Sequence, residues 1–133
     1  MTAPGVQVVF DCADPDRLAS FWAEALGYQK DWEWDDATVE WLLSNGLDRS
    51  AVGARSAISD PDGAGPRFFF QRVPEGKAVK NRVHVDVRLG LDAVDRLVAL
   101  GARVVRRADE QFGPFHDEFV VMQDPEGNEF CIS

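Results

Sequence analysis

The sequence predicts an α+β fold in which two tandem βαβββ modules form a curved eight-stranded sheet around a cup-shaped pocket. One observation is that a strand-like segment and a helix-like segment ending in Leu-Gly occur twice, with the glycines at 27 and 101. Another is that strand-like segments follow each helix. A single module of this kind cannot bury its bare sheet face alone, so two are expected to combine. We therefore predict one domain over residues 1–133, with half-modules at about 5–74 and 82–133.

The first half begins with a strand over 6–11, whose alternation places Gln7 on its polar face. A helix follows, because Asp14 can cap it and Pro15 suits its first position. Apolar residues then recur at helical spacing until Gly27, which is typical of a helix end. The remaining strands of this half are predicted over 28–34, 39–43, near 50–58, and 67–73.

The second half repeats this order. Its first strand, 83–88, alternates valines with His84, Asp86 and Arg88. A helix is predicted over 91–100, residues 108–115 are predicted to be a loop, and His116 is expected to be an exposed turn residue. The remaining strands of this half are predicted over 102–107, 117–123 and 128–132, the last of them after an Asp-Pro-Glu-Gly turn.

Charge and composition exclude several classes of protein. The chain carries 14 basic and 23 acidic residues, a net charge of −9, and no basic stripe, so nucleic acid is not an expected partner. It has no long apolar run and no charged-then-apolar leader, so we expect no membrane partner and a cytoplasmic location. The two cysteines, Cys12 and Cys131, make no disulfide framework and are expected to be thiols.

Motifs in both halves resemble one known family. The first helix has Asp14, then Phe21-Trp22, then Leu26-Gly27, and the chain closes with Asp124-Pro-Glu-Gly-Asn-Glu-Phe-Cys-Ile. Together with the repeat, these motifs resemble the glyoxalase/bleomycin-resistance/dioxygenase group, the vicinal oxygen chelate superfamily. The resemblance covers essentially the whole chain. It implies the fold and a homodimer, since small members commonly pair, but it leaves the activity open.

The resemblance also implies where a metal would bind. Metal-dependent members place ligands on the first and last strands of each half. These positions fall on Gln7, on Gln71 or a neighbouring phenylalanine, on His84, and on Cys131, with Glu129 two residues earlier on the same side. Only His84 is an unaltered strong ligand, and no carboxylate stands at the expected positions. No cofactor is therefore expected, and a divalent metal at His84 is the less favoured alternative.

We predict that a small organic molecule binds in the cup. The predicted contact residues are Gln7, Trp41, Gln71, His84, Glu129 and Cys131. Each also has a structural interpretation: His84 could be a hydrogen-bonded pocket histidine, Cys131 an apolar filler, and the tryptophans core residues. No catalytic residue is assigned, because a nucleophilic Cys131 would need a base such as His84.

Two functions remain open. One is a lyase, isomerase or dioxygenase of the superfamily. The other is a non-catalytic protein that sequesters a drug-type compound, for which an aromatic wall and an acidic surface suit a flat or cationic molecule. The discriminating feature is the metal site, since an open catalytic zinc site uses three protein ligands.

Overall fold

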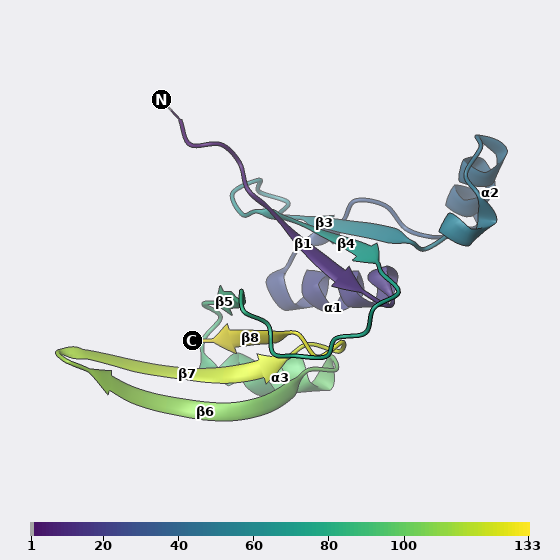
Figure 1. Cartoon of the computed structure of the whole chain (residues 1–133). Coiled ribbons are helices and arrows are strands. Elements are labelled where there is room, and N and C mark those ends of the chain that lie inside the picture. Colours follow the sequence, from purple (N-terminus) through teal and green to yellow (C-terminus); the bar gives the residue numbers. More distant parts are fainter. Residues whose placement is uncertain (1) are drawn as a thin grey trace. The chain divides into compact units, whose positions relative to one another are not determined.

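This computed structural model describes residues 2–133, which form two compact units divided after Gly76 (Figure 1). Each unit has a four-stranded mixed sheet and is of βαβββ type, the first with an additional helix between its second and third strands. The predicted fold class is confirmed, and the eight strands of the described residues are divided between two sheets of four. No helix in this part of the chain is long and apolar enough to cross a membrane.

The first unit has strand order β1-β4-β3-β2. Its strands are β1 (Gln7–Cys12), β2 (Gln29–Lys30), β3 (Arg55–Ser59) and β4 (Arg67–Arg72). Strands β1 and β4 are parallel, and the other neighbours are antiparallel. Helix α1 (Pro15–Leu26) begins as predicted, since the Asp14 carboxylate accepts a hydrogen bond from the Arg17 amide at 3.2 Å. It ends at Gly27, whose φ of 70° favours glycine.

The core of the first unit is aromatic. Trp22 of α1 is 1% exposed, and its ring lies 5.4 Å from Phe10 and 5.6 Å from Phe68, measured between ring centroids. Phe10 and Phe68 therefore face the helix. Gln7 and Gln71 have the opposite strand parity, which places them on the open face of the sheet.

The strand predicted over 39–43 is wrong, because these residues belong to helix α2 (Asp36–Ser44). Asp35 caps the start of this helix, since its carboxylate accepts a hydrogen bond from the Thr38 amide at 2.8 Å. The strand predicted over 28–34 shrinks to the two residues of β2. The predicted short strand near 50–58 is found as β3, after a 3₁₀ turn, η1 (Arg49–Ala51).

The second unit has strand order β5-β8-β7-β6. Its strands are β5 (Val85–Val87), β6 (Arg103–Phe112), β7 (Phe115–Gln123) and β8 (Glu129–Ile132). β5 is shorter than predicted, so His84 precedes it and Arg88 follows it. The helix predicted over 91–100 is a 3₁₀ turn, η2 (Leu91–Ala93), that continues into α3 (Val94–Ala99). The buried side chains of the second unit are mostly apolar: Val94, Leu97, Val120, Met122, Phe130 and Ile132.

The loop predicted over 108–115 is wrong as well. Strands β6 and β7 stay paired until Phe112 faces Phe115, and two residues make the turn between them. Gly113 has a φ of 58°, which suits the first position of a two-residue hairpin turn. His116 therefore lies on β7 and not in a turn, although it is exposed as expected.

The turn before β8 fixes the register of the last strand. Asp124 is 3% exposed, and its Oδ1 accepts hydrogen bonds from the amides of Glu126 at 2.9 Å and Asn128 at 3.0 Å. A carboxylate that bonds the backbone two residues on is a strong local turn signal. Glu129 and Cys131 consequently share one side of β8, as predicted.

Candidate ligand-binding site

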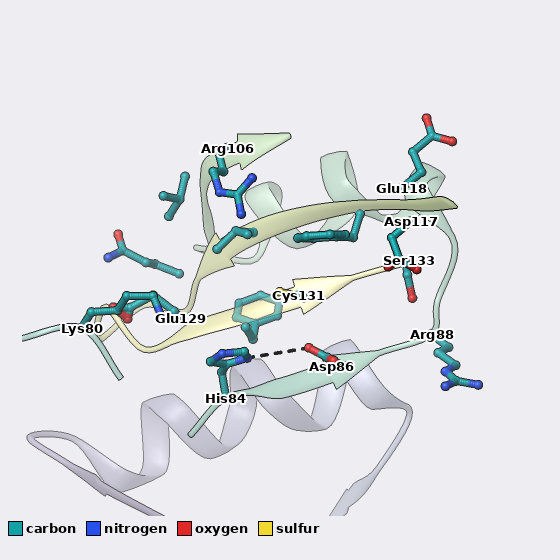
Figure 2. Close-up of a pocket in the computed structure, with 15 residues that line it drawn as sticks. Lys80, His84, Asp86, Arg88, Arg106, Asp117, Glu118, Glu129, Cys131 and Ser133 are labelled. Carbon is teal, nitrogen blue, oxygen red and sulfur yellow. Dashed lines mark ion pairs between the residues drawn. The ribbon is translucent and has the colours of Figure 1, made fainter. Parts of the chain in front are cut away.

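A cavity of about 680 Å³ lies over the open face of the sheet in the second unit (Figure 2). This volume lies in the usual range for sites that hold small molecules. Residues of all four strands and of the segment before β5 line it. Three of them, His84, Glu129 and Cys131, were among the predicted contact residues.

Strand pairing explains why distant residues meet at this cavity. β5 and β8 run parallel with Asp86 beside Cys131, and β7 and β8 run antiparallel with Val121 beside Cys131. Neighbours in register point to the same face of a sheet. Asp86, Cys131 and Val121 therefore form a row across three strands on the floor of the cavity.

Three groups that can bind a cation lie close together in this cavity. His84, Asp86 and Cys131 each offer one possible ligand atom, and these three atoms lie within 4.8 Å of one another. The His84 Nδ1 is 3.8 Å from Asp86 Oδ1, the contact drawn as a dashed line in Figure 2. His84 and Cys131 were expected at ligand positions, whereas Asp86 was not predicted as a ligand.

The Cys131 side chain is a protonated thiol at neutral pH. Burial raises its pKa above the ordinary value, and the negative charge and hydrogen bond of Asp86 raise this pKa further. The thiolate, and not the thiol, is the reactive form of cysteine. Cys131 is therefore a weak nucleophile in this surrounding.

We expect Asp86→Asn to speed the alkylation of Cys131 by iodoacetamide at pH 8. Removing the carboxylate charge lowers the pKa of the thiol, so a larger fraction is thiolate. Cys12 is 4% exposed and should react far more slowly, which mass spectrometry can separate by peptide. Asp62→Asn, in the first unit, is the matched control. Equal rates for Cys131 in the wild type and in Asp86→Asn would contradict this account.

Glu129 lines the cavity but its carboxylate is already engaged. The side chain is 7% exposed. Its carboxylate accepts hydrogen bonds from Lys77 Nζ at 2.8 Å and from the backbone amide of Asn81 at 3.4 Å. Burial alone would raise the pKa of Glu129, but these hydrogen bonds and the Lys77 charge outweigh burial, so the pKa is lowered. Glu129 thus holds the segment over 77–81 against β8 as a charged group.

The remaining cavity lining carries both signs of charge beside apolar side chains. The Arg106 guanidinium lies 5.6 Å from the Phe119 ring centroid and 3.2 Å from the Glu110 carboxylate. The cationic lining residues are Lys80, Arg88 and Arg106, and the anionic ones besides Glu129 are Asp86, Asp117 and Glu118. A ligand that fits here would carry both hydrogen-bond donors and acceptors.

The other predicted contact residues lie in the first unit. Gln7 accepts a hydrogen bond from Arg67 at 2.8 Å, and Gln71 donates one to Asp11 at 2.7 Å, both on the open face of that sheet. Trp41 lies on α2 and lines a separate cavity of the first unit. The expectation that all six residues surround one cup stays a prediction.

Sequence reasoning missed Arg106 and Phe119 as lining residues. Asp86 has the same strand parity as His84, which puts it on the polar face of its strand, and it does line the cavity. No sequence signal pointed to Arg106, since the pairing of β6 with β7 shifts by a residue between Val104 and Arg106. Such a bulge changes which side chains reach a face, so simple alternation cannot assign this one.

The sequence profile of the family described as "Glyoxalase-like domain" matches residues 7–133. No curated protein matches the chain in sequence. Several solved structures do share its fold. One is a glyoxalase/bleomycin resistance protein/dioxygenase family enzyme from Burkholderia phytofirmans, with a TM-score of 0.57 and 20% identity over 95% of this chain and 94% of that one.

Two other solved structures were determined with bound molecules. The fosfomycin resistance protein FosX of Listeria monocytogenes, a point mutant with Mn(II) and 1S,2S-dihydroxypropylphosphonic acid, has a TM-score of 0.64 and 11% identity, covering 99% and 90% of the two chains. The bleomycin-binding protein of Streptomyces verticillus, with copper(II)-bleomycin, has a TM-score of 0.58 and 16% identity, covering 100% and 97%. At these identities, the likeness is one of fold.

Proposed function

Because the chain belongs to the family of glyoxalase-like domains, we propose that it binds a small organic molecule on the open face of its second sheet. The observation that carries this proposal is the cavity of about 680 Å³, with apolar side chains and convergent groups of both charges. Pockets of this size with a few placed polar groups are the usual form of a small-molecule site. The ligand is a compact molecule with both donors and acceptors.

The site supports sequestration more than catalysis. Binding needs only shape and complementary polar groups, which the cavity has. Catalysis would need, besides a base such as His84, a nucleophile in its reactive form or a bound metal. The Glu129 carboxylate forms an ion pair with Lys77, and the raised pKa of Cys131 keeps its side chain a thiol. The bleomycin-binding protein is named for holding a drug, and we propose the same kind of role here.

A metal-dependent lyase, isomerase or dioxygenase is the second candidate. It is favoured by the group of His84, Asp86 and Cys131, whose imidazole, carboxylate and thiol match the ligand types of zinc. The group suits a hard cation such as Mn(II) poorly because one donor is sulfur. Cys131 would have to lose its proton to ligate. A bound zinc ion would supply Lewis-acid chemistry, while His84 and Asp86 would hold it at the cavity floor.

We expect the purified protein to hold no stoichiometric metal. Elemental analysis after gentle purification measures this, and a thermal-shift screen of metals and organic compounds measures what stabilises the fold. The proposal predicts stabilisation by organic compounds without added metal. About one zinc, nickel, iron or manganese per chain, lost in both His84→Ala and Asp86→Asn, would contradict it and favour the second candidate.

We also expect a homodimer. Strand β6 lies at the edge of its sheet and is ten residues long, and long exposed edges in native proteins are usually covered. Phe112 and Phe115 at the end of the β6–β7 hairpin are 79% and 65% exposed, which gives a second copy apolar surface to contact. Sedimentation at micromolar concentration should show twice the chain mass of 14.8 kDa. A single species of the chain mass would contradict the dimer.

The proposed location is the cytoplasm. The Cys12 thiol donates a hydrogen bond to the Gln71 carbonyl and Cys131 is a free thiol, and a reducing compartment keeps such groups reduced. Fractionation of the native cells, followed by detection of the protein in the cytosolic fraction, tests this.

A further inference from the structure

The first unit has a second cavity, of about 550 Å³, that the proposed function does not use. It is built where the segment after β2, helix α2, η1 and the start of β3 meet. Its lining residues are Trp32, Trp34, Thr38, Trp41, Leu42, Leu47, Ala51, Ala54 and Arg55. Three of the four tryptophans of the chain therefore surround one space.

Two of these tryptophans form a fixed aromatic corner. The rings of Trp32 and Trp34 lie 6.3 Å apart between centroids and 78° apart between planes. The Trp34 indole donates a hydrogen bond to the Arg55 carbonyl at 2.8 Å, which ties that ring to β3. The Trp32 indole nitrogen is buried and has no hydrogen-bond partner among the described residues. Buried donors are almost always paired, so the hydrogen bonding of this cavity wall is incomplete.

Helix α2 supplies the facing wall but buries none of its own residues. Thr38, Trp41 and Leu42 are spaced three and four residues apart, which places them on one side of the helix. Trp41 is 63% exposed even though it lines the cavity. Apart from Arg55 and Thr38 the lining is apolar, and a mostly apolar cavity with few polar groups is the usual form of a small-molecule site.

The charge at this cavity is that of one arginine. Arg55 is the charged residue of the lining, and its guanidinium makes no ion pair with any residue in 2–133. The capping carboxylates of α2 and η1 already accept hydrogen bonds from their own helices, Asp35 from the Thr38 amide and Asp48 from the Ser50 amide. An arginine beside an apolar pocket matches a planar anion such as a carboxylate.

We propose that this cavity is a second binding site, which takes a planar aromatic molecule bearing a carboxylate. The ring lies against the tryptophan faces, where aromatic groups gain both burial and favourable ring geometry. The carboxylate pairs with Arg55. A compact ligand fits better than a protein surface, because the volume lies within the range of small-molecule sites. The site is independent of the cavity on the second sheet, since none of their lining residues are shared.

Calorimetric titration with naphthalene-2-carboxylate tests the proposal on the full chain. We expect one saturable site per chain, with affinity at least tenfold weaker in Trp41→Ala and at least fivefold weaker in Arg55→Gln. Arg49→Gln, an arginine of η1 outside the lining, is the matched control and should bind like the wild type. The cation 2-naphthylmethylammonium should bind more weakly than the carboxylate. Circular dichroism verifies that each variant is folded.

A variant of the second sheet separates this site from the proposed function. Val121→Trp fills the other cavity and should leave naphthalene-2-carboxylate binding unchanged. The proposal is overturned if the wild type shows no saturable binding, or if Trp41→Ala and Arg55→Gln bind as tightly as the wild type. It is also overturned if Val121→Trp abolishes binding, or if Trp41→Ala dissociates an oligomer, which would make α2 an interface between copies.

Discussion

Replacement of Trp22 by alanine is expected to lower the free energy of unfolding by about 3–5 kcal/mol. Trp22 is 1% exposed and its ring contacts Phe10, Phe21 and Phe68, so its removal leaves a large cavity between α1 and the first sheet. The surrounding rings cannot collapse fully into that space. Urea unfolding followed by circular dichroism measures the change.

Trp41→Ala is the matched control for this prediction. It deletes the same side chain from a position that is 63% exposed, so stability should change by only about 0.5 kcal/mol. The packing described for the first unit is wrong if Trp22→Ala and Trp41→Ala destabilise the protein equally.

Replacement of Lys77 by methionine should cost about 2 kcal/mol, because it leaves the buried Glu129 carboxylate without its charged donor. The methionine keeps most of the apolar side chain, so the loss reports on the ion pair and not on packing. Lys80→Met is the control, since within residues 2–133 the Lys80 ammonium makes only an exposed hydrogen bond, to the Asn81 carbonyl.

The effect of Lys77→Met should depend on pH. The pKa of Glu129 in the folded wild type is below its ordinary value of 4.5, so its stabilising contribution is fully present above that pH. It is lost as the pH falls through the folded-state pKa. In Lys77→Met burial dominates and raises this pKa, so the protonated form is favoured in the folded state. The stability difference between the two proteins should therefore be largest near neutral pH and shrink in acid. A difference that is constant from pH 7 to pH 3 would contradict the ion pair.

Local signals predicted the fold where they agreed with tertiary packing. The start and end of α1 followed from Asp14, Pro15 and Gly27, whose roles depend only on the helix itself. The strand prediction over 39–43 was wrong because a short run of valine, tryptophan and leucine is compatible with a strand and with a helix. The Asp35 carboxylate caps a helix there, and an aspartate before a short apolar run is as common in turns as at helix starts.

The site was predictable to the extent that strand parity fixes it. His84, Glu129 and Cys131 reach one cavity because each lies on the open face of its strand or just before it. Arg106 was hidden by the bulge in β6, and Trp41 was placed on a strand that does not form. The closeness of Asp86 to Cys131 depends on the pairing of β5 with β8, which no pattern within one strand reveals.

The most direct test of the ligand site on the second sheet compares thermal shifts in two matched variants. Val121→Trp fills the cavity from its floor, while Val98→Trp adds the same side chain to the exposed side of α3, outside the lining. A compound at one hundred times its dissociation constant stabilises the folded protein by about 2.7 kcal/mol. We expect compounds with mixed charge from the screen to stabilise the wild type and Val98→Trp and to lose this effect in Val121→Trp. Equal stabilisation of all three proteins would show that the ligand binds elsewhere and would contradict the central claim.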